Sequence, residues 1–104
     1  MTDHRWNLLV GARSLVVEGF SDQGVTRVEY VSAFPQDDFA VWLATTTDAQ
    51  AQALSHVVGL RERVAAILVG VGFREDELSG LMVVTQSQEA VDRDYGGSWF
   101  YALR

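Results

Sequence analysis

Apolar residues recur every three or four positions in two stretches of the chain, which is the spacing of one helix face. The pattern predicts one helix over residues 5–20 and a second over residues 48–70. Thr47 and Gln50 have the spacing of a capping box, in which each side chain accepts a hydrogen bond from the backbone of the other. Gly59 is the weak point of the second helix, because glycine destabilises a helix interior by about 1 kcal/mol relative to alanine.

Four further stretches have the composition of β-strands. Residues 25–34, 39–46, 81–87 and 98–103 are rich in β-branched and aromatic residues and are bounded by turn residues. Residues 35–38 (Pro-Gln-Asp-Asp) are typical of a turn that joins the first two strands into a hairpin. The predicted order is αββαββ. It indicates an α+β fold, a two-layer sandwich in which two helices cover one face of a mainly antiparallel, four-stranded sheet.

The length of 104 residues corresponds to one α+β domain over residues 1–104. Its two halves share a short similarity, LVVEGF at residues 15–20 and LVGVGF at residues 68–73. This similarity suggests a weak internal duplication of an αββ unit, with copies at residues 5–47 and 48–104. Two similar helix endings would give the same pattern, because both segments close with glycine and an apolar residue.

Both faces of the predicted sheet are apolar. An open face of an antiparallel sheet is normally polar at alternate positions, but the strands at residues 39–46 and 98–103 are apolar on both faces. Something should cover the second face, since large exposed apolar patches mark interaction sites. The alternatives are a second copy of the chain, another protein, a small apolar ligand, or the chain itself. Trp42 and Trp99 are the aromatic anchors expected at such an interface.

Composition and charge exclude several functions. With 14 acidic and 8 basic residues the net charge is -6, and a surface that binds nucleic acid through its phosphates needs clustered cations. The absence of cysteine removes disulfides and thiol nucleophiles, and the absence of lysine removes Schiff-base chemistry. The longest apolar run, residues 64–73, is shorter than the roughly 20 residues of a membrane span. No signal peptide is evident, so a cytoplasmic protein is expected, and arginine without lysine suggests a bacterial source.

Residues that carry chemistry are sparse. His4 and His56 stand alone in the sequence, without a partner that would make either a general base. The acidic groups lack the spacing of a calcium loop, and no Gly-x-Ser-x-Gly elbow is present. The sequence therefore predicts no catalytic residue, no metal ligand and no cofactor.

Residues 86–98 are the most polar stretch of the second half of the chain. They are interpreted either as a functional loop or as an extended hairpin that closes at Gly96 and Gly97. Arg93 is suited to clamp a carboxylate or phosphate, and Tyr95 to stack or to donate a hydrogen bond. The candidate binding residues of this segment are Asp92, Arg93, Asp94 and Tyr95.

Two hypotheses for function follow. The first is a non-enzymatic cytoplasmic protein-binding domain of chaperone, adaptor or inhibitor type, homodimeric through its apolar sheet face, with a different protein as the other partner. The second is a small-molecule-binding domain or modest enzyme with a site near residues 86–98. Neither nucleic acid nor a membrane is an expected partner. In layout alone, the predicted domain is similar to the secretion-chaperone-like folds, which are dimers that bind other proteins.

Overall fold

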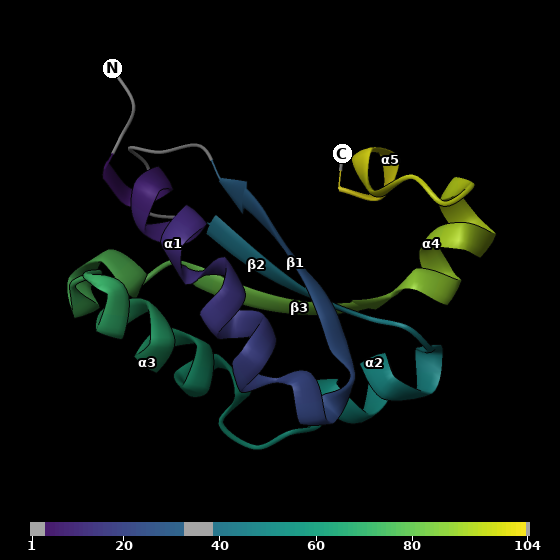
Figure 1. Cartoon of the computed structure of the whole chain (residues 1–104), viewed down its shortest axis with the longest axis horizontal. Helices are drawn as coiled ribbons and strands as arrows, with labels where there is room; N and C mark the ends of the chain where they lie inside the picture. The colour runs from purple at the N-terminus through teal and green to yellow at the C-terminus, as the bar shows by residue number, and fades with distance from the viewer. Residues whose placement is uncertain (1–3, 33–38, 104) are drawn as a thin grey trace.

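The computed structural model describes residues 4–32 and 39–103 (Figure 1). In this part of the chain, helices and a mixed sheet form an α+β fold. In chain order the elements are α1 (His4–Gly19), η1 (Ser21–Gln23), β1 (Val25–Ser32), β2 (Phe39–Thr45), α2 (Asp48–Ser55), α3 (Leu60–Val71), η2 (Glu75–Leu78), β3 (Leu81–Ser87), α4 (Gln88–Tyr95) and α5 (Trp99–Ala102), where η marks a 3-10 helix.

β2 is the central strand of a three-stranded sheet, antiparallel to β1 and parallel to β3. Parallel strands cannot be joined by a tight turn, so the chain crosses from β2 to β3 through α2 and α3. The predicted four-stranded, mainly antiparallel sheet with two helices is therefore wrong in strand number, strand direction and helix number, as is the order αββαββ. The turn predicted at residues 35–38 lies outside the described residues.

The main core lies between one face of the sheet and the helices α1 and α3, which run side by side (Figure 1). α1 confirms the helix predicted over residues 5–20 and buries Leu9, Ala12 and Val16, whose spacing places them on one helix face. α3 buries Val64 and Leu68 in the same way. The sheet contributes Val25, Val28, Phe39, Val41, Leu43 and Leu81 to this core.

The helix predicted over residues 48–70 is two helices. The capping box is confirmed: the Gln50 backbone N–H donates to Thr47 Oγ1 at 3.2 Å, and the Thr47 N–H donates to Gln50 Oε1 at 3.0 Å. α2 then ends at Ser55, and Gly59 has a φ of 74°, a left-handed value that glycine adopts without strain. This break changes the direction of the chain, so that α3 packs beside α1.

The segment interpreted as a loop or extended hairpin, residues 86–98, contains helix α4. Ser87 caps its start, because Ser87 Oγ accepts a hydrogen bond from the Ala90 backbone N–H at 3.0 Å. Gly96 ends the helix with a φ of 60°, and its N–H donates to Val91 O. The two glycines that suggested a hairpin turn therefore belong to a helix ending.

The strand predicted at residues 98–103 is the short helix α5. Ser98 caps it by accepting a hydrogen bond from the Tyr101 backbone N–H at 3.4 Å. The alternating aromatic residues indicated a strand, but so short a run does not separate the period of a strand from that of a helix. In the structure the Ser98 cap closes a helical turn, and Trp99 joins a small apolar cluster with Ala44 and Val91.

Leu68 tests the assignment of the main core. Its side chain is fully buried, so Leu68→Ala should lower the free energy of unfolding by about 2–5 kcal/mol. Val58 is 96 % exposed in the turn before α3, and Val58→Ala should change that free energy by less than about 0.5 kcal/mol. Urea denaturation followed by circular dichroism measures both values. Equal effects of the two substitutions would contradict the core described above.

Candidate functional site

The second face of the sheet, opposite α1 and α3, is covered at one end by α4 and α5. Ala44 of β2, Val91 of α4 and Trp99 of α5 form a small apolar cluster separate from the main core. Trp99 is 6 % exposed, and its Nε1–H donates to Gln88 Oε1 at 2.8 Å. The Arg27 guanidinium lies over the Trp99 ring, 5.3 Å from its centroid, in a cation–π arrangement. The chain itself therefore covers this end of the face.

Apart from Arg27 and Glu29 of β1, the rest of the second face is mostly apolar and partly exposed. Side chains alternate along a strand, so Ala40 and Trp42 lie on the face opposite Phe39 and Val41. The ladder places Val31 and Met82 on either side of Ala40, where they are 40 % and 60 % exposed. The open sheet patch, as we call this surface, consists of Val31, Trp42, Met82, Val84 and Phe100, whereas Ala40, between Val31 and Met82, is buried.

A groove of about 440 Å³ joins the patch to α5. Val31 and Phe100 both line this groove, so α5 extends the apolar surface beyond β1. Tyr30 borders the groove from β1, but its side chain packs against the main core on the other face of the sheet, where its buried hydroxyl has no hydrogen-bond partner among the described residues. Burial raises the pKa of Tyr30 to about 12, although the nearby Arg13 acts in the opposite direction, so the hydroxyl keeps its proton at neutral pH.

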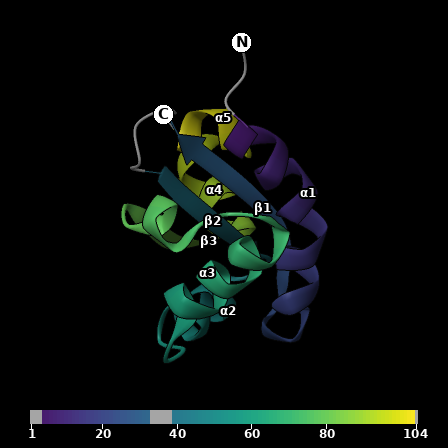
Figure 2. The same cartoon turned by 90° about the vertical axis from the view of Figure 1, so that its left-hand side faces the viewer.

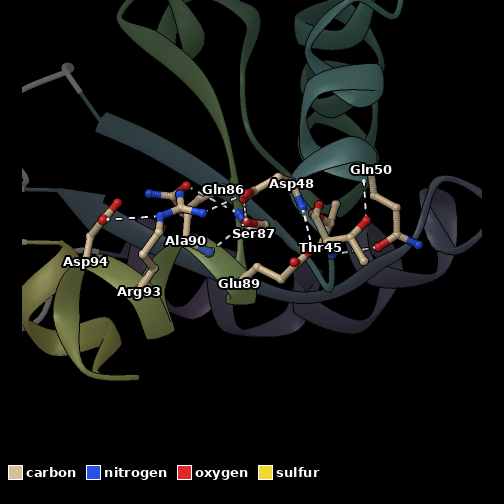
Figure 3. Close-up of polar contacts among 10 residues, drawn as sticks. Thr45, Asp48, Gln50, Gln86, Ser87, Glu89, Ala90, Arg93 and Asp94 are labelled. Atoms are coloured by element: carbon tan, nitrogen blue, oxygen red, sulfur yellow. Dashed lines mark hydrogen bonds and ion pairs between the residues drawn. The ribbon is translucent and has the colours of Figure 1, made fainter.

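Polar side chains meet at the carboxyl ends of β2 and β3, where α2 and α4 begin (Figure 3). Asp48 Oδ1 accepts a hydrogen bond from Ser87 Oγ, and Asp48 Oδ2 accepts one from Arg93 Nη1 at 2.9 Å. Glu89 Oε1 accepts a hydrogen bond from the Asp48 backbone N–H at 3.0 Å. We call Asp48, Ser87 and Arg93 the helix clasp, because they join the start of α2 to the end of β3 and to α4.

The helix clasp favours the charged forms of Asp48 and Arg93. The hydrogen bond from Ser87, and then that from Arg93, holds the pKa of Asp48 below its usual range. The hydrogen bond to Asp48 in turn raises the pKa of Arg93. The first turn of a helix carries a partial positive charge, so carboxylates near the starts of α2 and α4 are favourably placed.

The helix clasp does not have the geometry of a catalytic centre. Ser87 donates to a carboxylate instead of to an imidazole, and its side chain is 1 % exposed. His56, at the end of α2, forms hydrogen bonds through its ring Nδ1 with its near neighbours Ser55 and Gln52. The part of the chain that the structure describes contains no group of three or more side chains able to hold a metal ion. Within the same residues, no helix is long and apolar enough to span a bilayer.

The structure distributes the predicted site residues over three places. Trp42 lies in the open sheet patch, Trp99 lies beneath α5, and Arg93 lies in the helix clasp. Neither the groove beside the patch nor two others, of about 520 and 480 Å³, is lined by Arg93 or its neighbours on α4. On α4, Asp94 lies 3.4 Å from Arg93 Nε, Asp92 accepts a hydrogen bond from Gln88, and Tyr95 is 40 % exposed.

Sequence reasoning missed the helix clasp, although a signal for it was present. Ser87 is followed by an acidic residue, Glu89, and then by Arg93 and Gly96, which is the order of start and stop signals of a helix. Arg93 does clamp a carboxylate, as its chemistry suggested, but that carboxylate belongs to Asp48 of the same chain.

No protein-family model matches the sequence. Searches among curated proteins and among solved structures likewise found no match. The inference of function therefore depends on the surface and contacts described above.

Acid should weaken the attachment of α4. Because the pKa of Asp48 is lowered in the folded state, the helix clasp stabilises the fold above the usual Asp pKa, and this contribution is lost as the pH falls below about 4. Amide hydrogen exchange should show lower protection factors in α4 at acid pH than at neutral pH. Asp48→Asn should give the lower values already at neutral pH.

A matched control for this substitution is Asp76→Asn, since Asp76 is 73 % exposed and pairs with Arg74 outside the helix clasp. It should leave the protection of α4 unchanged. Equal protection of α4 in the wild type and in Asp48→Asn would show that the clasp does not hold this helix.

Proposed function

We propose that this chain is a non-enzymatic protein-binding domain of chaperone, adaptor or inhibitor type, and that it binds through the open sheet patch. The supporting observation is the apolar, partly exposed second face of the sheet, with Met82 60 % and Phe100 69 % exposed. Contiguous apolar surface of this kind marks interaction sites, and aromatic residues and methionine are enriched at interfaces. A cytoplasmic location in a bacterium is part of this proposal and rests on composition.

The first proposed partner is a second copy of the chain, which makes the protein a homodimer; a different protein is the alternative partner. A net charge of -6 opposes self-association, so the charges near the contact matter. Arg27 and Glu29, which lie on the same face as the patch, form an ion pair with each other. β3 carries no charged side chain. Two copies can therefore approach here without placing like charges together.

A small-molecule site near residues 86–98 has weaker support. Arg93, which would bind the ligand, is already paired with Asp48 and Asp94. Its α4 neighbours line none of the three grooves described above. A ligand would have to displace the helix clasp to reach the guanidinium.

Val84 tests the proposed homodimer. Light scattering on a sizing column should give the wild type about twice the monomer mass of 11.5 kDa. Val84→Glu should give the monomer mass, because it puts a carboxylate into the apolar contact. Val10, which is 68 % exposed on α1, supplies the control Val10→Glu, which should stay dimeric.

Thermal denaturation of both variants verifies that each is folded. A wild type that elutes at the monomer mass at every concentration would contradict the homodimer. Binding of another protein through the patch would then be the remaining form of the proposal.

A further inference from the structure

The two edges of the sheet differ in how they are protected. At the edge formed by β1, Arg13 of α1 donates a hydrogen bond to Val28 O, and the strand carries the charged residues Arg27 and Glu29. The strand also has an irregularity near its start. Charges, bulges and covering side chains are the devices that keep edge strands from pairing with other chains. β3, with the sequence Leu-Met-Val-Val-Thr-Gln-Ser, has no charge and no proline.

The backbone of β3 alternates between β2 and the outside. The Phe39 N–H donates to Gly80 O at 3.4 Å at the start of the ladder. In a parallel ladder this bond means that the backbone N–H and C=O groups of the even-numbered residues of β3 point toward β2. Those of the odd-numbered residues point away from it. Arg61 supports this assignment, because its Nε donates to Leu81 O from outside the sheet at 2.9 Å.

The middle of this edge differs from its two ends. Arg61 occupies the carbonyl of Leu81, and the Ser87 N–H donates to Gln86 Oε1 at 3.3 Å. Between them, the N–H and C=O groups of Val83 and Thr85 form no hydrogen bond with the part of the chain that the structure describes. These groups form a template for another strand.

We propose that two copies of this chain join by antiparallel pairing of their β3 strands about a two-fold axis at Val84. The proposal rests on the homodimer proposed above and places its contact at the β3 edge, beside Met82 and Val84 of the open sheet patch, and not across the whole patch. In this register Val83 of one copy lies opposite Thr85 of the other, and the two residues exchange both backbone hydrogen bonds. By symmetry every unpartnered N–H and C=O group of Val83 and Thr85 gains a partner.

This register also suits the side chains and the other backbone groups. Val84 lies opposite Val84 of the second copy, and Met82 lies opposite Gln86, so no like charges meet across the seam. Moving the axis to Val83 would instead place Thr85 opposite Leu81, whose carbonyl is already bonded to Arg61. That shift would leave hydrogen bonds unmade, which makes it the poorer register.

Edge pairing would bring the two open sheet patches together. The combined sheet runs from β1 of one copy through the two β3 strands to β1 of the other. Met82 and Val84 lie at the seam, whereas the half-buried Trp42, on the central strand, stays accessible to a further protein. The dimer would thus present one continuous apolar face.

Thr85→Pro tests the edge pairing. The Thr85 N–H points away from β2, so proline at this position leaves the internal ladder intact, and the monomer should fold. The substitution removes the Thr85 N–H of each copy, which in the proposed register donates to the Val83 carbonyl of the other copy. Light scattering at about 0.15 M salt, where the net charge is screened, should show a dimer dissociation constant at least tenfold higher than in the wild type. Thr85→Val keeps the N–H and should stay dimeric.

Trp42→Glu separates edge pairing from face-to-face packing. It should stay dimeric if the edges pair and become monomeric if the patches stack on each other. A monomeric Trp42→Glu together with a dimeric Thr85→Pro would overturn the edge pairing but keep the proposed homodimer. A wild type that is monomeric at every concentration would overturn both.

Amide hydrogen exchange of the wild type gives a second test that needs no variant. The amides of Val83 and Thr85 should be protected in the dimer and should lose that protection on dilution to monomer. Rapid exchange of both amides in a protein that is dimeric by mass would overturn the edge pairing.

Discussion

The central strand β2 is buried along its whole length except at the half-buried Trp42. Both faces of the sheet must therefore be covered along this strand, and the rest of the chain is arranged around that requirement. α1 and α3 cover one face and build the main core (Figures 1 and 2). α4 and α5 cover the other face around Ala44. These helices leave the open sheet patch partly exposed, so the candidate site is the part of the second face that the chain does not fully cover.

The parallel pairing of β2 with β3 has a second consequence. It brings two strand ends and two helix starts to one place, with Thr45 opposite Ser87. The carboxyl ends of parallel strands are where ligands bind in open α/β sheets. Here the chain supplies its own carboxylates, from Asp48 and Glu89, to these helix starts. The polar residues that resembled a binding site hold α4 in place, which leaves the apolar surface as the functional candidate.

The contrast between the two sheet edges supports the same conclusion. Arg13 covers a carbonyl at the edge of β1, and Arg61 does the same at the beginning of β3. Beyond Arg61 the edge of β3 is uncharged and continuous with the patch. The proposed pairing of two copies at this edge would join their open sheet patches into a broader face for other proteins.

The sequence alone determined the features that depend on neighbours a few residues apart. Local spacing is enough to predict the helix ending at Gly19, the capping box at Thr47 and the three strands of the sheet. The apolar residues at both odd and even positions of β2 indicated that both faces of the sheet are apolar there. The end of the chain was misread, because the Ser87 cap was overlooked and the run at residues 98–103 was too short to show its period.

Only the tertiary structure decided the direction of β3, the break at Gly59 and the covering of the second face. The physical reason is distance along the chain. Arg93 meets Asp48 across 45 positions, and the parallel pairing depends on where α3 returns the chain to the sheet. Such contacts are set by packing of the whole molecule, and no local pattern of residues encodes them.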